Sequence, residues 1–232
     1  MNKIILTLLV FVLFSSCTPP LATEQPVLAK PTPQDAQNLD PVEDAVAQRL
    51  SENLGLKKSD IFVVSNQEVE FGNACLDIAF PDVMCAQVVT LGRVIVLEAG
   101  GVDYEYHTSA DGDFIQPATI VLIWTREGGL VGFCDQLTVF LSGEVYGSNC
   151  RAQPREMESN FANLFSVSEQ KQFKAWFSKY GEINLDVSDP AGVSDRMMNT
   201  LVFYGGGTGK PGKADEQALF DWANELFQKL YS

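Results

Sequence analysis

The chain has 232 residues, of which 46% are hydrophobic, so it can form one large domain or two small ones with a real core. It carries 30 acidic residues against 16 Lys and Arg, for a formal net charge of −14. So acidic a surface repels nucleic-acid phosphates and anionic lipid head groups, which argues against a nucleic-acid partner.

The first 16 residues have the layout of a secretory signal peptide. Lys3 supplies a positive charge, an apolar run over residues 4–14 follows, and two serines close the segment. A membrane-spanning helix needs about 20 apolar residues, so this run is too short to serve as one. We therefore predict that residues 1–16 are removed during export.

The residues at the expected cleavage point, Leu13-Phe14-Ser15-Ser16-Cys17, resemble the lipobox of bacterial lipoproteins, with Phe14 where leucine is usual. The resemblance implies that Cys17 becomes an acylated N-terminus, of the palmitate-carrying kind, and that the folded part lies in the cell envelope outside the cytoplasm. Thr18 follows rather than aspartate, which favours the outer membrane if the organism has one. More than one acyl chain makes such anchoring stable. The alternative is an ordinary secreted protein in which Cys17 is incidental.

Residues 17–38 are expected to tether the folded body to the lipid. Few of them could build a core, and prolines recur among Thr, Gln, Ala and Glu, at Pro19, Pro20, Pro26, Pro31 and Pro33. This composition predicts a semi-rigid, mostly extended linker.

Four further cysteines, Cys75, Cys85, Cys134 and Cys150, are predicted to form disulfides, because the export signal implies an oxidising compartment. Three pairings are open. We favour Cys75–Cys85 with Cys134–Cys150, since each pair lies in one half of the chain, and each would stabilise by roughly 2–3 kcal/mol. Metal binding is disfavoured, because there is no C-x-x-C motif and only one histidine.

Residues 39–116 are expected to form a first α+β unit. Asp40 can cap a helix beginning at Pro41, Glu43 completes a capping box, and Gly55 ends the helix. β-rich segments follow, over residues 61–65, 68–71, 86–91, 94–98 and 102–108. Turns are expected at Gly72-Asn73, Gly92 and Gly100-Gly101. The prediction is one helix with a small antiparallel sheet.

Residues 117–232 are expected to form a second α+β unit. Strands are predicted over residues 119–126, 136–141, 144–146 and 197–204. A helix capped by Ser166 should end at Gly181, and a last helix over residues 215–230 turns apolar residues inward. This order of elements suits α+β layers rather than a parallel α/β sheet.

The N-terminal unit carries a succession of short motifs. It consists of Leu54-Gly55, Val63-Val64, Glu68-Val69-Glu70-Phe71, Cys75-Leu76-Asp77 and Tyr104-Glu105-Tyr106-His107. In this pattern, residues 42–108 resemble an uncharacterised domain of bacterial envelope proteins, with Asp77 in place of a usual glycine. Aspartate tolerates left-handed backbone better than most residues. The resemblance implies no known activity.

The C-terminal unit has a strand running into Gly128-Gly129-Leu130-Val131-Gly132, a helix over residues 168–180, Asp195 before a strand that ends at Tyr204, and a last helix. In these features it resembles emfourin, a proteinaceous inhibitor of thermolysin-type metallopeptidases. The resemblance implies partner contact through Gly128, Gly129 and Leu130. Emfourin-like proteins are cytoplasmic and lack the Cys134–Cys150 pair, and a shared fold does not fix function.

No motif supports catalysis or cofactor binding. His107 has no serine or cysteine motif beside it, so we interpret it as a structural residue that bonds a loop. The segment Gly205–Lys210 departs from a phosphate-binding loop and is interpreted as a flexible connection, although such a loop could still be a contact surface. Asp111-Gly112-Asp113 lacks the continuing ligands of a calcium loop and is interpreted as a turn.

Three hypotheses of function remain. We favour a non-enzymatic, lipid-anchored envelope lipoprotein that binds another macromolecule without metal or cofactor; its partners would be the membrane and an envelope protein or peptidase. The second hypothesis is a metallopeptidase inhibitor acting through Gly128-Gly129. The third is a wall- or glycan-degrading enzyme using scattered carboxylates, although Asp186, Asp189 and Asp195 have no recognisable acid–base spacing.

Overall fold

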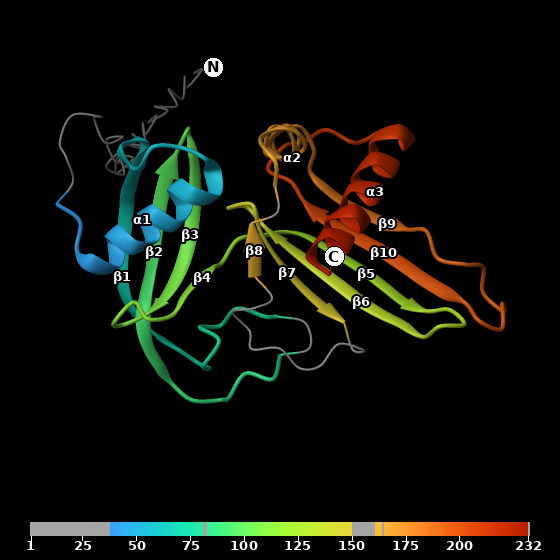
Figure 1. Ribbon diagram of the computed structural model, residues 1–232, viewed down its shortest axis with the longest axis horizontal. Coiled ribbons are helices and arrows are strands. Elements are labelled where there is room, and N and C mark those ends of the chain that lie inside the picture. The colour runs from blue at the N-terminus through green and yellow to red at the C-terminus, as the bar shows by residue number, and fades with distance from the viewer. Residues whose placement is uncertain (1–37, 81–82, 150–160, 164, 232) are drawn as a thin grey trace, which may run out of the picture. The chain divides into compact units, whose positions relative to one another are not determined.

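A computed structural model describes residues 38–80, 83–149, 161–163 and 165–231 (Figure 1). These residues form an α+β fold with two antiparallel sheets, as the sequence predicts. The predicted signal peptide, Cys17 and Cys150 lie outside the described residues.

The first sheet has the order β1-β2-β3-β4 and is covered by one helix (Figure 1). Its elements are α1 (Pro41–Leu54), the 3-10 turn η1 (Lys58–Asp60), β1 (Ile61–Phe71), β2 (Thr90–Ala99), β3 (Val102–Ser109) and β4 (Ile115–Pro117). Every strand pairs with its neighbour in sequence, so the sheet is a simple meander.

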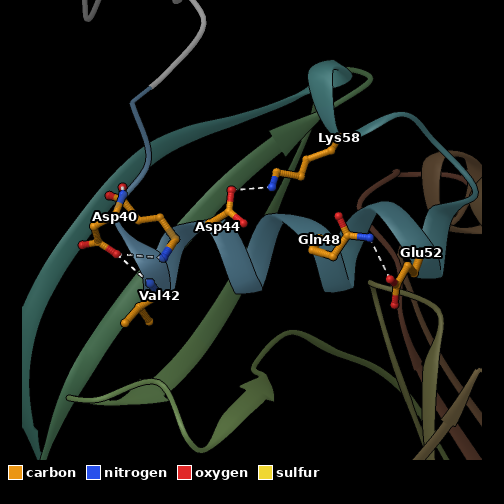
Figure 2. Close-up of polar contacts among 7 residues, drawn as sticks. Asp40, Val42, Asp44, Gln48, Glu52 and Lys58 are labelled. Carbon is orange, nitrogen blue, oxygen red and sulfur yellow. Dashed lines mark hydrogen bonds and ion pairs between the residues drawn. The ribbon is translucent and has the colours of Figure 1, made fainter.

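Helix α1 begins and ends as predicted. The Asp40 carboxylate accepts hydrogen bonds from the backbone N–H groups of Val42 and Glu43, and Glu43 completes the capping box. Gly55 ends the helix with a φ of 62°, in the left-handed region that glycine adopts readily. Figure 2 shows the cap, together with the polar pairs that Asp44 forms with Lys58 and Gln48 with Glu52 along the exposed face.

Three details of the predicted first sheet are wrong. The segments predicted over residues 61–65 and 68–71 are one strand, β1, with an irregularity after Val63. The strand predicted over 86–91 begins only at Thr90. Gly92 is not a turn but lies inside β2, where a Cβ atom would come 2.1 Å from the carbonyl oxygen of Thr108. Glycine is therefore needed there for close approach of two backbones.

The second sheet has the order β8-β7-β6-β5-β10-β9, with α2 and α3 packed against it (Figure 1). Its elements are β5 (Ile120–Gly128), β6 (Phe133–Phe140), β7 (Glu144–Asn149), β8 (Phe161–Asn163), α2 (Val167–Lys179), β9 (Glu182–Asp186), β10 (Met197–Tyr204) and α3 (Lys213–Leu230). The sequence predicts all of these except the short strands β8 and β9. Ser166 caps α2 in a capping box with Glu169, as predicted.

The two sheets share their apolar packing. One cluster of buried residues runs from Val42 and Leu50 of α1, through Trp124 of β5, to Phe227 of α3. In a second cluster, the loop between β1 and β2 contributes Phe80 and its neighbours, which pack against Phe140 and Tyr146 of β6 and β7. Strand β7 is consequently buried along almost its whole length.

Candidate functional site

The predicted contact residues Gly128, Gly129 and Leu130 lie at the tip of the β5–β6 hairpin. Gly128 pairs with Phe133, and the Gly132 N–H donates to the Gly129 carbonyl oxygen at 3.0 Å, which closes the loop. The three glycines have positive φ angles of 82°, 70° and 68°. Local sequence therefore dictates this tight turn, because a side chain at these positions would strain the backbone.

The hairpin tip is held to the neighbouring loop between β9 and β10. The Gly129 N–H donates to the Arg196 carbonyl oxygen at 3.0 Å, and a Cβ on Gly128 would lie 2.4 Å from the same oxygen. Arg196 is fixed in turn, since its Nε donates to the Asp189 carbonyl oxygen at 2.7 Å. Two adjacent loops thus brace one another at this end of the sheet.

Below the tip, Arg126 anchors the hairpin to the core. Its Nε donates to Oδ2 of the buried Asp135 at 2.9 Å, and its guanidinium lies 4.1 Å from the centre of the Phe133 ring. A charge-assisted hydrogen bond together with a cation–π contact therefore links β5 to β6 close to the hairpin tip.

The tip itself presents apolar side chains to solvent. Leu130 is 86% exposed and Val131 64% exposed, and Val193 of the braced loop and Met198 of β10 are also exposed. These leucine, valine and methionine side chains carry no nucleophile, acid or base, so what they offer a partner is shape and apolar contact. A rigid loop that displays apolar residues is a typical protein contact.

His107 bonds a loop, as interpreted from the sequence. Its Nδ1 lies 2.7 Å from the Leu76 carbonyl oxygen, and its ring stacks on Phe71 at 4.9 Å. The Nε2 atom lies 3.0 Å from Oε1 of Glu105, so both ring nitrogens are engaged. Leu76 belongs to the loop between β1 and β2, and His107 thereby fastens that loop to β3.

The same loop contains a predicted disulfide, Cys75–Cys85. Asp77 has a φ of 58°, and its carboxylate accepts from the Gly72 N–H at 3.0 Å. Aspartate can therefore keep the tight turn that glycine would allow. Cys134 is also disulfide-bonded, while its predicted partner Cys150 lies outside the described residues.

The glycine-rich segment Gly205–Lys210 is not a loose connection, and this corrects the sequence-based interpretation. The N–H groups of Gly206, Gly207 and Gly209 donate to the carbonyl oxygens at the end of α2, at 2.8–3.2 Å. A Cβ on Gly205 would lie 2.1 Å from the Tyr180 carbonyl oxygen. The segment therefore caps the otherwise unpaired carbonyls of the helix C-terminus, and glycine is needed because the two backbones touch.

The carboxylates considered for chemistry make local contacts. Asp111 accepts from the Ser109 hydroxyl and the Asp113 N–H, which forms the predicted turn. The side-chain oxygens of Asp186 and Asp189 accept from the N–H groups of Ser188 and Met197. Within residues 38–80, 83–149, 161–163 and 165–231, no group of three or more His, Cys, Asp or Glu is placed to hold a metal ion.

One buried polar cluster escaped the sequence analysis. The Glu144 carboxylate accepts from the Tyr106 hydroxyl at 3.0 Å, the Ser142 hydroxyl at 2.9 Å and Arg49 Nε at 2.8 Å. Burial raises the pKa of Tyr106 well above its usual value, and the nearby Glu144 charge acts in the same direction. The cluster joins α1 and β3 to β7. The only indication of it in the sequence was Glu144, a single charged residue in a largely apolar segment.

A cleft that the sequence did not predict lies between β9 and α3. It has a volume of about 390 Å³ and is lined by Asn184, Leu185, Asp186 and Val187 of the β9 region and by Lys213, Glu216, Gln217 and Phe220 of α3.

In comparisons with known proteins, the one match covers the residues of the first sheet. Residues 43–117 match a family described as a domain of unknown function (DUF8738), which spans α1 to β4. This match confirms the prediction of an uncharacterised domain in that region. No curated protein and no solved structure matches the chain. Among the described helices, none is long and apolar enough to cross a membrane.

Proposed function

We propose that this chain is a lipoprotein of the cell envelope, held at a membrane by lipid on Cys17, and that it binds another macromolecule without catalysing a reaction. Binding takes place at the tip of the β5–β6 hairpin. The observation that carries the proposal is the exposure of Leu130 and Val131 on a turn braced by Gly129 and Arg196. A preformed apolar contact loses little conformational entropy on binding, so it favours affinity.

Lipid attachment is tested separately from binding. Cells expressing the full chain are grown with an alkyne analogue of palmitate, and label on the purified protein is measured. We expect labelling of the wild type and none of Cys17→Ser, while Cys134→Ser serves as a control that leaves labelling intact. Labelling of Cys17→Ser at the wild-type level would refute anchoring at this residue.

A second candidate function is inhibition of a thermolysin-type metallopeptidase. Its support is the resemblance to emfourin together with the order β5, α2, β10, α3, which follows the order of elements in that resemblance. The apolar tip at Leu130 is suited to a peptidase cleft, because clefts that bind peptides are lined largely by apolar side chains.

The test is an activity titration with the full chain in mild detergent against a panel of such peptidases. Stoichiometric loss of activity that Leu130→Asp abolishes would support inhibition, since the exposed tip would then carry a charge into the contact. Val64→Asp is the matched control, because Val64 is an exposed valine on β1. Full peptidase activity at micromolar protein would exclude inhibition for that panel.

A further inference from the structure

Among the strands that the structure describes, β9 forms one edge of the second sheet. β9 pairs with β10 on one side, and it stands last in the order of described strands. The Val187 N–H donates to the Asn199 carbonyl oxygen, which continues the register in which odd-numbered residues face β10. The backbone polar groups of Glu182, Asn184 and Asp186 therefore point away from the sheet, because these groups alternate in direction along a strand.

The cleft beside α3 lies along this edge. Its volume of about 390 Å³ falls within the range of about 300–1,000 Å³ typical of ligand clefts. Apolar side chains come from Leu185 and Val187 on the strand side and from Phe220 on the helix. Ile183, next in the same alternation, is buried in the core. Every second side chain of a strand added to β9 would therefore lie beside Leu185, Val187 and Phe220, and Lys213, Glu216 and Gln217 of α3 line the rest of the cleft.

The alternate residues of β9 form an acidic face, and two of them, Asn184 and Asp186, also border the cleft. Glu182, Asn184 and Asp186 are all exposed, and Asn184 Nδ2 donates to Glu182 Oε1 at 2.9 Å, which orients that carboxylate. Hydrogen bonds from Ser188 hold the pKa of Asp186 below its usual range, so this group is charged at neutral pH. Oppositely charged side chains on neighbouring strands attract, so this face favours lysine or arginine on an added strand.

We propose that β9 and the cleft beside α3 form a second binding site, which takes an extended segment of a partner protein by β-strand addition. The segment alternates apolar side chains, which enter the cleft, with basic side chains, which lie beside Glu182 and Asp186. Main-chain hydrogen bonds to β9 supply affinity, and the alternation supplies specificity. This site requires neither the hairpin tip nor lipid on Cys17.

A second copy of the chain is a poor occupant. If two β9 strands paired antiparallel about Asn184, Glu182 of each would face Asp186 of the other. Like charges directly opposite one another destabilise a strand pair. A basic partner segment removes this repulsion, and β9 with its five residues sets the length of the paired region.

The experiment measures fluorescence anisotropy of short labelled peptides mixed with the full chain in mild detergent. One peptide alternates valine and lysine, a second alternates valine and glutamate, and a third has the composition of the first in a non-alternating order. We expect the first peptide to bind most tightly, because only its alternation brings valine to Leu185 and Val187 and lysine to Glu182 and Asp186 at the same time.

Two variants locate the binding. Asn184→Pro removes an N–H that points away from the sheet, leaves pairing to β10 intact, and should weaken binding at least tenfold. Asn184→Ala is its matched control, because it removes the same amide side chain but keeps the backbone N–H, and it should bind at least tenfold more tightly than Asn184→Pro. Glu182→Lys should weaken the valine–lysine peptide about two- to fivefold and favour the valine–glutamate peptide. Circular dichroism establishes that each variant is folded.

Three results would overturn the proposal. The first is absence of binding at millimolar peptide, and the second is equal binding by Asn184→Pro and Asn184→Ala. The third is a dimer in analytical ultracentrifugation that Asn184→Pro dissociates, because it would make a second copy the occupant.

Discussion

The two sheets of this protein are stabilised by different means. The first has a single helix, and the long loop between β1 and β2 is fixed by Cys75–Cys85 and by His107. The second buries a group of aromatic rings between its strands and two helices, with Phe173 stacked on Trp222 at 5.5 Å. Both regions contribute to a buried apolar core, to which the first adds a cross-link and polar contacts and the second a group of packed aromatic rings.

The two regions also differ in whether binding is expected there. The hairpin tip and the β9 edge both belong to the second sheet, whose aromatic core keeps its strands in position. In the first region, the apolar residues of the disulfide-bonded loop pack against the second sheet. The ring centres of Phe80 and Tyr146 lie 5.1 Å apart. The loop between β1 and β2 therefore joins the first region to β6 and β7 of the second.

The largest effect is expected from Phe173→Ala, which would break the aromatic core. Phe173 is 1% exposed and contacts the rings of Phe165, Phe203 and Trp222. Such a truncation costs about 3–5 kcal/mol of unfolding free energy, through lost burial and the cavity left behind. Urea unfolding checks this, and Phe173→Leu should lose much less. A loss below about 1 kcal/mol would show that burial does not dominate this region.

The next effect tests the first sheet, through the double variant Cys75→Ala and Cys85→Ala. Without the cross-link, the unfolding free energy should fall by roughly 2–3 kcal/mol. Hydrogen exchange should quicken in the loop between β1 and β2 but not in α2 or α3. Equal loss of protection in both sheets would mean that the cross-link supports the whole body rather than its own region.

Sequence patterns predicted the features that depend on neighbouring residues. The helix ends at Asp40, Gly55 and Ser166 each arise from chemistry within a few residues. The pair Cys75–Cys85 was likewise local. These features stand out because local geometry alone, such as positive φ or an unpaired helix N–H, selects the residue type.

Features built from distant segments escaped prediction. Strand β9 has only two apolar residues, Ile183 and Leu185, and its place beside β10 depends on long-range pairing. The cleft requires β9 and α3 together, so no single segment indicates it. The predictions for Gly92 and Gly205 were wrong for the same reason. Each position needs glycine because the backbone of a distant residue, Thr108 or Tyr180, approaches it closely.

A smaller effect tests the polar link between the sheets. Glu144→Gln keeps the shape of the side chain but removes the charge that faces Arg49, at a cost of about 1–3 kcal/mol. The described tryptophans Trp124, Trp176 and Trp222 all lie in the second region, so their fluorescence reports its unfolding. We expect the midpoint of the fluorescence transition to shift to a lower urea concentration in Glu144→Gln. An unshifted transition would show that the Glu144 charge does not stabilise the second sheet.

The smallest effect concerns the cap of α1. Asp40→Ala should cost about 1 kcal/mol at neutral pH, because the N–H groups of Val42 and Glu43 lose their acceptor. Asp40→Asn is the matched control, since its amide oxygen can still cap the helix. The contrast with Phe173→Ala measures how far a surface cap and a buried ring differ in their contribution to stability.

The pH dependence of the Asp40 contribution follows from its ionisation. The hydrogen bond from the Glu43 N–H, with help from Arg93, holds the pKa of Asp40 below its ordinary value of 3.8, although burial opposes this. The folded state thus favours the charged form, and the contribution is full above 3.8 and is lost as the pH falls through the lowered value. Urea unfolding of Asp40→Ala and the wild type, from neutral to about pH 3, should show curves that converge at the acid end. Asp40→Asn should lie between them at neutral pH, and a gap that stays constant with pH would assign the cap to geometry rather than charge.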